Sequence, residues 1–584
     1  MSSTSPHHRL NWRLLVRYLQ PYRRQVLLLA GILGAMIAIQ LATPLVASMF
    51  IDRATGAGAM DTLIALAVLT MVLALLGQGI ALAETWVAER ISWGATNALR
   101  EDLASHLLHL DAAFHQAHTP AALIEQVDGD VGTLARLFSH FTVYVIGNAL
   151  LIAGVLALLY AVDWRVGLSL TLFVGIALVT ILRLRVVATP FSAAERQAGA
   201  EFYGFLGEYL AGLEDIRASG ARAFVLRRFA EVLRGWLAAK IRAQMRGYSM
   251  VAVSQGLFGL GMAVALALSA MLYRDGALTI GAVFLLFRYT EMLRQPTEQI
   301  RNEVQDLQQA GASLGRIEGL LNQQSRLTDG PGDHLPPGPL ALDLDQVWFG
   351  YEPGSPVLRG VTLHLAPRRV LGIMGRTGSG KTTLTRLLPR FYDPAAGVVC
   401  LGGVDLRTVA VAAVRARVGL VTQEAHLFNA SIRDNLTLFD NSVPDERLVD
   451  ILESLSMGPW LHELPAGLAT VLGAGGIGLS AGQTQVLACA RLLLRDPDLV
   501  ILDEPSSKLD SATERLVHQA LGRLLAARTG IIVAHRLSTV AFADDILILE
   551  RGEVLEHGPR LTLAAAPTSH YSAMLRLAAG EDTA

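Results

Sequence analysis

The chain has 584 residues, which is more than one ordinary domain holds, so at least two domains are expected. Hydrophobic residues make up 52% of it and charged residues only 17%. That balance is apolar for a water-soluble protein and indicates membrane-spanning segments. The formal net charge of −2 argues against a nucleic-acid partner, because nucleic-acid-binding domains are usually basic.

The first half of the chain contains apolar runs close to the roughly 20 residues that a spanning helix needs. Five of them are long: Val26–Ile51, Leu63–Leu82, Phe141–Ala161, Val166–Leu182 and Val251–Leu272. A sixth run, Leu278–Phe287, is short and is followed directly by Arg288. We count it as a span, because only an even number of spans returns the second half of the chain to the side of the N-terminus.

Arginines orient these spans. Five arginines precede the first span, whereas the three outside turns hold only Arg53, Arg165 and Arg274. Positive residues accumulate on the cytoplasmic side, so the N-terminus and the second half of the chain are predicted to be cytoplasmic. The protein is therefore expected to be a multi-pass protein of the cytoplasmic (inner) membrane. Cys400 and Cys489 would then be ordinary thiols without a disulfide.

A stretch rich in Pro and Gly, Thr328–Leu340, marks the boundary between the two halves. Beyond it, short apolar strand-like runs alternate with helical stretches, which predicts a mixed sheet flanked by helices. The expected domains are a cytoplasmic N-terminal segment (1–25), an α-helical membrane domain of six spans with long cytoplasmic extensions (26–327), a linker (328–340) and an α/β domain (341–584).

One octapeptide in the second half matches the phosphate-binding pattern G-x-x-x-x-G-K-[ST] at every fixed position. It reads Gly375, Arg376, Thr377, Gly378, Ser379, Gly380, Lys381, Thr382, and Thr383 follows it. The glycines allow a tight turn whose N–H groups can point at phosphate oxygens. Lys381 can reach the β- and γ-phosphates of a nucleotide, and the Thr382 hydroxyl can ligate Mg²⁺. ATP and Mg²⁺ are therefore the expected cofactors.

A second motif is the apolar run Leu499–Leu502, which is followed directly by Asp503 and Glu504. A carboxylate at the carboxyl end of a strand can hold the Mg²⁺ shell, and a second one beside it can polarise an attacking water. The alternative is a buried strand followed by a solvated turn, which the preceding phosphate loop makes the weaker interpretation.

With these residues in place, the chain resembles an ATP-binding-cassette (ABC) exporter half-transporter, in which six spans precede one nucleotide-binding domain. Leu479-Ser480-Ala481-Gly482-Gln483 resembles the LSGGQ signature that separates ABC domains from other P-loop ATPases. Four further matches occur in the family's order, namely Tyr351 (adenine-stacking aromatic), Gln423 (Q-loop), Ser507–Asp510 (D-loop) and His535 (switch histidine).

The resemblance implies a role for each matched residue. Glu504 would be the general base, and His535 would contact the γ-phosphate; taken alone, His535 would be read as a buried structural histidine. Thr382 and Gln423 would ligate Mg²⁺, with Asp503 in its outer shell. Ser480 and Gly482 would cap ATP held by the opposite subunit, with Asp510 in the D-loop. Each site would then need two facing nucleotide-binding domains, so a second half-transporter is an expected partner.

The family also implies coupling segments and a transport path. The expected coupling segments are His118–Val131 and Glu208–Phe224, for which simple packing is the alternative. Polar residues within spans are candidates for contact with the unidentified cargo, although amides and paired charges in spans also join helices. These candidates are Gln40, Gln78, Glu84, Asn148, Gln255, Arg288 and Glu291.

The predicted function is ATP-driven export by alternating access, and the alternative is a membrane-bound, ATP-gated regulatory protein that does not transport. An importer fits less well, because importers usually keep spans and nucleotide-binding domain on separate chains. A heterodimer is favoured over a homodimer, because the surface offered to the opposite site is altered. Ala481 replaces a glycine, Val486 an arginine and Ala474 a glutamate. In a homodimer, Ala481 would simply be small enough to tolerate.

Overall fold

The computed structural model describes residues 12–56, 58–137, 144–423, 425–473, 476, 478–503, 511–534 and 537–581. The chain divides into two compact units. The membrane unit comprises residues up to Leu108 and Pro120–Gln323, and the α/β unit comprises His109–Thr119 and Gln324–Ala584. The glutamate, aspartate and histidine expected at positions 504, 510 and 535 lie outside the described residues.

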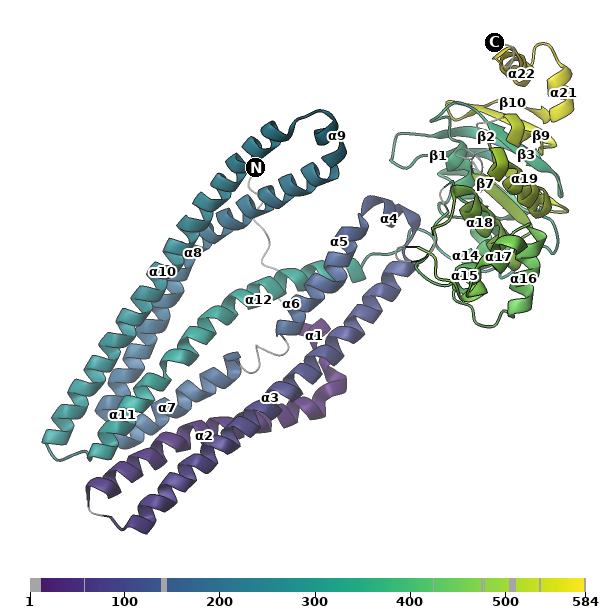
Figure 1. Ribbon diagram of the computed structural model, residues 1–584. Coiled ribbons are helices and arrows are strands. Elements are labelled where there is room, and N and C mark those ends of the chain that lie inside the picture. The colour runs from purple at the N-terminus through teal and green to yellow at the C-terminus, as the bar shows by residue number, and fades with distance from the viewer. Residues whose placement is uncertain are drawn as a thin grey trace. The chain divides into compact units, whose positions relative to one another are not determined.

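The described residues of the membrane unit form helices joined by short turns, and they form no strand (Figure 1). Its helices are α1 (Trp12–Leu19), α2 (Arg23–Thr55), α3 (Met60–His109), α5 (Pro120–Ile124), α6 (Val131–Arg136), α7 (Asn148–Val162), α8 (Trp164–Ala211), α9 (Leu213–Ala218), α10 (Arg222–Arg274), α11 (Ile280–Met292) and α12 (Arg294–Leu321). Helices α8 and α10 lie side by side and are joined through α9, and α2 is followed by α3 after a short turn (Figure 1).

Within the described residues, five helices are long and apolar enough to cross a membrane. They contain four of the five long apolar runs whole and residues 144–161 of the other, so those spans are confirmed as helices of sufficient length. The sixth expected span falls on α11, which has 13 residues and is too short to cross alone. Helix α12 begins directly after Leu293, so the two helices together provide the length that a crossing needs.

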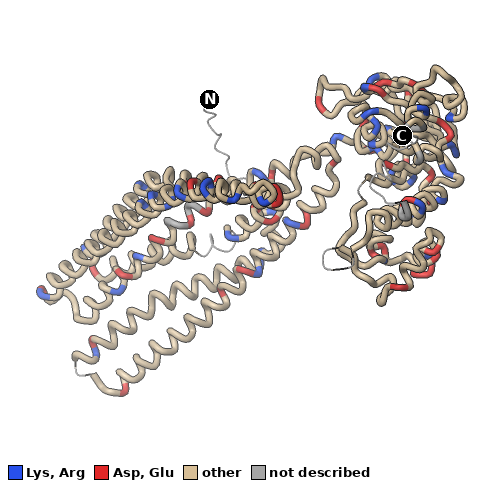
Figure 2. Tube along the Cα trace, turned by 45° about the horizontal axis from the view of Figure 1, so that its top comes forward, with Lys and Arg blue, Asp and Glu red and all other residues tan. Residues whose placement is uncertain are grey.

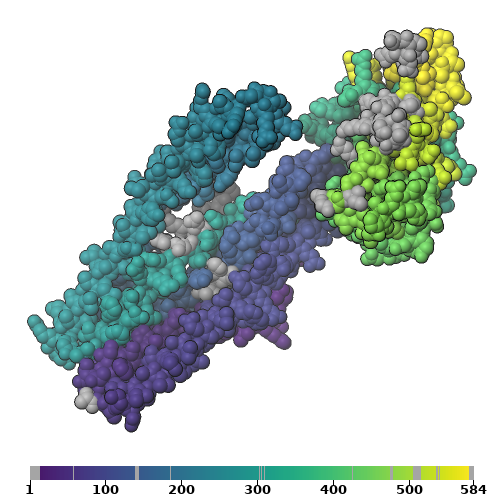
Figure 3. All heavy atoms as spheres, viewed as in Figure 1, coloured from purple at the N-terminus to yellow at the C-terminus, as the bar shows by residue number. Residues whose placement is uncertain are grey.

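Charge is distributed along these helices as a bilayer requires (Figure 2). Residues 62–83 of α3 carry no charged side chain, and charges return only from Glu84 onward. At the outer end, the Asp52 carboxylate of α2 accepts hydrogen bonds from the Thr279 hydroxyl (2.8 Å) and the Gly281 N–H (2.7 Å). These contacts tie the end of α2 to the start of α11 (Figure 3).

The α/β unit contains two sheets. The first is antiparallel with the order β2-β1-β4-β5, and its strands are β1 (Leu342–Phe349), β2 (Leu358–Leu365), β4 (Ala396–Leu401) and β5 (Val404–Asp405). The second has the order β10-β9-β3-β8-β7-β6, and its strands are β3 (Val370–Met374), β6 (Val418–Val421), β7 (Leu499–Asp503), β8 (Thr529–Val533), β9 (Asp545–Glu550) and β10 (Glu553–Pro559). Among the described strands of this second sheet, only β10 is antiparallel to its neighbour. The predicted α/β class is confirmed.

Helices pack around these sheets (Figure 1). They are α4 (Ala112–Ala117), α13 (Lys381–Leu387), α14 (Val411–Arg417), α15 (Ile432–Thr437), α16 (Asp445–Ser454), α17 (Gly458–Glu463), α18 (Ala481–Arg495), α19 (Ser511–Leu525), α20 (Leu537–Val540), α21 (Arg560–Ala565) and α22 (His570–Glu581). Every residue of β3 and β8 is buried, as expected for central strands of a parallel sheet covered on both faces.

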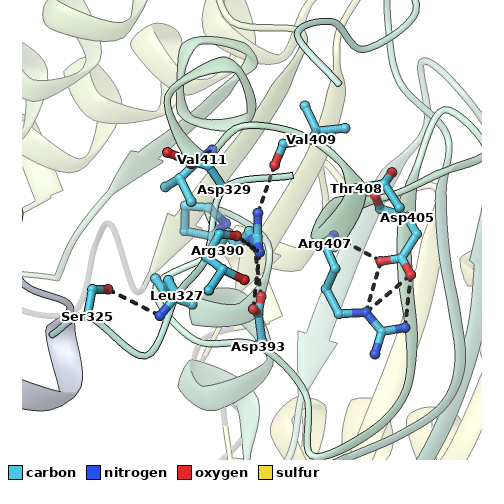
Figure 4. Close-up of polar contacts among 12 residues, drawn as sticks. Ser325, Leu327, Asp329, Arg390, Asp393, Asp405, Arg407, Thr408, Val409 and Val411 are labelled. Atoms are coloured by element: carbon cyan, nitrogen blue, oxygen red, sulfur yellow. Dashed lines mark hydrogen bonds and ion pairs between the residues drawn. The ribbon is translucent and has the colours of Figure 1, made fainter. Parts of the chain in front are cut away.

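A buried arginine fixes the segment through which the chain enters the α/β unit (Figure 4). Arg390 is 1% exposed and pairs with Asp393, with a distance of 2.8 Å between Nε and Oδ1. Its remaining N–H groups donate to the carbonyl oxygens of Thr328 and Val409, each at 2.8 Å. Nearby, the Val411 N–H donates to the Asp329 carboxylate at 2.8 Å. The segment from Thr328 is thereby fastened to the loops around β5 and α14.

Candidate functional site

The phosphate-loop sequence lies between β3 and α13, at the carboxyl end of a central strand. Its three glycines all have positive φ: Gly375 (145°), Gly378 (81°) and Gly380 (103°). A Cβ on Gly375 would lie 2.2 Å from the Leu549 carbonyl oxygen, and one on Gly380 would lie 2.8 Å from a Leu358 methyl group. Glycine is therefore required by conformation at all three positions and by space at two of them.

Lys381 begins α13 and is only 5% exposed. Its ammonium donates to the carbonyl oxygens of Gly375 (2.8 Å) and Arg376 (3.1 Å), so the loop curls around it. The Ser379 hydroxyl beside it is buried and has no hydrogen-bond partner among the described atoms. A buried hydroxyl without a partner is costly, and an anionic ligand in this loop would supply the missing acceptor.

Tyr351 belongs to an aromatic group beside the loop. Its ring makes edge contacts with Phe349 (5.1 Å between centroids) and Tyr392 (5.4 Å), and it remains 38% exposed. Its hydroxyl lies 3.3 Å from the Thr383 hydroxyl on α13. Burial raises the pKa of the neighbouring Tyr392, which keeps that phenol neutral. Tyr351 thus presents part of an aromatic ring next to the phosphate loop, as an adenine-stacking residue requires.

One cavity of about 650 Å³ brings together the oxygen donors expected around a metal ion. Thr382 is the last residue of the phosphate loop and lies in the first turn of α13, Gln423 follows β6 and Asp503 ends β7, and all three line this cavity. Helix α18 supports the loop after β6, because the Gln485 amide donates to the Gln423 carbonyl oxygen at 3.0 Å. Gln485 is 6% exposed and is not among the site residues predicted from the sequence.

The signature segment lies at the start of α18. Ser480 caps this helix: its hydroxyl accepts from the Gln483 N–H (3.2 Å), and the Gln483 side chain accepts from the Ser480 N–H (3.0 Å). Ser480 and Ala481 are exposed, whereas Gly482 is buried. None of these residues lines the cavity described above. Val486 is fully buried in the core of the unit, so its side chain packs inward.

The first expected coupling segment spans the boundary between residues that group with the α/β unit and residues that group with the membrane unit. The residues that cluster with the α/β unit are His109–Thr119, whereas residues 120–131 cluster with the membrane unit. Helix α4 packs Ala112 and Ala113 against the core of the α/β unit, and His115 and Gln116 line the same cavity as Thr382. The expected coupling segment, His118–Val131, overlaps the group His109–Thr119 only at His118 and Thr119, and its coupling role stays a prediction.

Asp111 is the residue that could have indicated the start of α4 from the sequence. Its carboxylate accepts from the Phe114 N–H (2.9 Å) as the N-cap of α4, and also from the Arg326 N–H (2.5 Å). The signal in the sequence was an aspartate followed by Ala112-Ala113-Phe114, which is typical of a capped helix start. Asp111 is 7% exposed and joins α4 to the chain entering the α/β unit.

Comparison with known proteins agrees with this geometry. Residues 27–297 match the model of the ABC transporter transmembrane region, and residues 358–507 match the ABC transporter model. The cyclolysin secretion/processing ATP-binding protein CyaB of Bordetella pertussis is 32% identical over 93% of this chain and 76% of its own. An ATP-dependent lipid A-core flippase of Chromobacterium violaceum is 30% identical over 79% of each chain.

A solved structure shares the fold. A bacterial Atm1-family ABC exporter with ATP bound superposes with a TM-score of 0.80 at 24% identity, covering 95% of this chain and 98% of that one. Taken with the fused domains and the phosphate loop, these matches identify the chain as a member of the ABC transporter family, a half-transporter of the exporter type that hydrolyses ATP and spans the inner membrane with its nucleotide-binding domain in the cytoplasm.

Proposed function

We propose that this chain drives export with ATP–Mg²⁺ held between its own phosphate loop and the signature segment of a second half-transporter. The observation that carries this proposal is the shared cavity, in which Thr382, Gln423 and Asp503 supply the oxygen donors that Mg²⁺ prefers. Thr382 and Gln423 would ligate the ion, with Asp503 in its outer shell. When bound, Mg²⁺ neutralises charge on the phosphate oxygens.

The other proposed roles in nucleotide binding and hydrolysis belong to residues of this chain. Lys381, already directed into the loop, binds the phosphates, and Tyr351 stacks on the adenine. Gly375, Arg376, Thr377, Gly378, Ser379, Gly380 and Thr383 complete the nucleotide-binding segment. Glu504 polarises the attacking water, and His535 contacts the γ-phosphate. Ser480, Gly482 and the D-loop residue Asp510 serve the nucleotide of the opposite subunit, because the signature residues lie away from the chain's own cavity.

A heterodimer is proposed because the two surfaces of the nucleotide-binding domain differ. The phosphate loop, Gln423 and Asp503 keep the family pattern, whereas the signature carries Ala481, an exposed Cβ at a position where backbone approaches phosphate. Val486 contributes less to this argument, since it is buried in the core. Residue 474, the third altered position, lies outside the described residues. One competent site would then combine this chain's Glu504 with the partner's signature.

Expression of this chain alone tests the proposal. Its particle mass shows whether it dimerises, and its ATPase rate shows whether two of its own surfaces make a working site. We expect slow hydrolysis, and a gain of about fivefold or more for Ala481→Gly, which is roughly 1 kcal/mol of the barrier. Ala481→Ser keeps a Cβ and should give no gain. A stable dimer with two equal, fast sites, unchanged by Ala481→Gly, would overturn the heterodimer.

A further inference from the structure

Five helices of the membrane unit line a cavity of about 640 Å³. Its lining comes from α2, α3, α7 and the α11–α12 region, together with Tyr144 just before α7. Five of the seven polar residues singled out from the sequence line it: Gln40, Glu84, Asn148, Arg288 and Glu291. Leu33, Met36, Ile37, Leu151 and Met292 supply apolar surface. The cavity is therefore amphiphilic, as small-molecule sites usually are.

The two arginines of this lining are each paired within their own helix region. Arg288 pairs with Glu291 three residues on (2.5 Å), and Arg294 pairs with Glu298 four residues on (3.5 Å). Asn148 donates to the Gln299 side chain at 2.8 Å. The positive charge in the lining is thus already balanced by neighbouring carboxylates, which leaves little to attract an anion.

Glu84 differs from the other charged residues of the cavity. It is 8% exposed, and among the described residues no hydrogen bond or ion pair involves its carboxylate. The lining holds three glutamates and two arginines, and both arginines are paired with the other two glutamates. The carboxylate of Glu84 is therefore the one without a balancing arginine in this lining. Ionisable residues within membrane helices are costly, and they typically face a cavity and mark a pathway.

The level of Glu84 also suits a route from the cytoplasm. It lies 24 residues (84 − 60) from the start of α3, which corresponds to roughly 36 Å of helix. That is about the thickness of the hydrocarbon core, measured from the outer end. A cargo entering from the inner face would meet Glu84 early.

We propose that this cavity binds an amphiphilic cation, with Glu84 as its counter-charge and the apolar side chains of α2, α7 and α11 around its body. The inference rests on the proposed export function, because it names the class of cargo for that path. A cationic group would compensate the buried carboxylate, and the cargo's apolar part would displace water from Leu33, Ile37 and Leu151.

Equilibrium dialysis of tetraphenylphosphonium against the full-length protein in nanodiscs tests this proposal, with empty nanodiscs as the blank. Tetraphenylborate, the anion of the same size and shape, is measured in parallel. We expect saturable binding of the cation, preferred over the anion, and a Kd at least tenfold weaker for Glu84→Gln. Glu89→Gln removes the same charge from an exposed position of the same helix and should leave the Kd within twofold.

Other outcomes would overturn the proposal: no saturable cation binding, a preference for tetraphenylborate, or unchanged binding by Glu84→Gln. If Glu84 instead has a structural role, Glu84→Gln should lower the Tm of the unliganded protein, and Glu84→Asp should restore that Tm while the cation preference stays unchanged. That combination would also contradict the proposal. The binding assay contains no nucleotide, so its result does not depend on ATP hydrolysis. Failure of this proposal and failure of the proposed ATP-driven function can therefore be distinguished.

Discussion

Tyr351 shows how one exposed aromatic ring can contribute to nucleotide affinity. Its ring contacts Phe349 and Tyr392, while its hydroxyl lies 3.3 Å from the Thr383 hydroxyl. Tyr351→Ala should raise the Kd for ATP about five- to thirtyfold, a loss of about 1–2 kcal/mol, because a stacking face is removed. Tyr351→Phe keeps the ring and should bind nearly as wild type in a fluorescent-nucleotide titration. Equal losses in the two variants would assign the effect to the hydroxyl.

Some individual residues of the site follow from the sequence, and others do not. The phosphate loop could be predicted because its chemistry depends on backbone conformation, and positive φ at Gly375, Gly378 and Gly380 matches the residue types. Gln485 could not, because its role depends on a contact with the Gln423 carbonyl that joins segments 62 residues apart. Glu84 was one of seven polar candidates, and only the arrangement of helices shows that it is the charged one for which the described residues supply no ion pair.

At the scale of elements, α4 depends on Asp111. Its carboxylate caps the helix and holds the Arg326 N–H, so Asp111→Ala removes both contacts. The cap alone is worth about 0.5–2 kcal/mol. We expect the variant to bind ATP normally but to lose most of the coupling between cargo and ATPase rate, measured as the stimulation by tetraphenylphosphonium. Asp111→Asn retains a capping side chain and should be less affected. Wild-type stimulation in Asp111→Ala would contradict this role.

Two arginines of the α/β unit, each paired with an aspartate, provide a matched test of burial (Figure 4). Arg390 is fully buried and holds Asp393, Thr328 and Val409, whereas Arg407 is 41% exposed in its pair with Asp405. Arg390→Met should destabilise the unit by about 3–5 kcal/mol, because it leaves a half-buried carboxylate and two carbonyl groups without their donor. Arg407→Met should cost at most about 1 kcal/mol.

The midpoints of thermal unfolding of the two full-length variants check this difference. A larger loss for Arg407→Met, or equal losses, would show that the contacts of Arg390 do not hold the entry segment.

The lengths of the membrane helices could be predicted only in part. Apolar runs mark where a helix lies in lipid, so Leu63–Leu82 was found from composition alone. They do not mark where the helix ends, and α3 continues to His109 through polar and charged residues. For the same reason α4 was not predicted, since a six-residue helix has no periodicity to detect. A cap such as Asp111 is the only local signal at that scale.

At the scale of the whole molecule, the proposed transporter has an amphiphilic cavity in its membrane unit and an ATP site that needs a second subunit. The fold and the family follow from the sequence because several motifs occur in one order along the chain. The assembly does not, because Ala481 is a change of one methyl group whose consequence depends on the surface opposite it.

The most direct measurement is ATP turnover by the assembled, full-length transporter with Glu504→Gln in this chain, compared with wild type. Glu504 is proposed to polarise the water, whereas Lys381 and Tyr351 bind the nucleotide. The account predicts that the variant retains bound ATP while its hydrolysis rate falls by about 100-fold or more. Lys381→Ala, as the matched control, should instead lose ATP binding. Hydrolysis by Glu504→Gln at the wild-type rate would contradict the account.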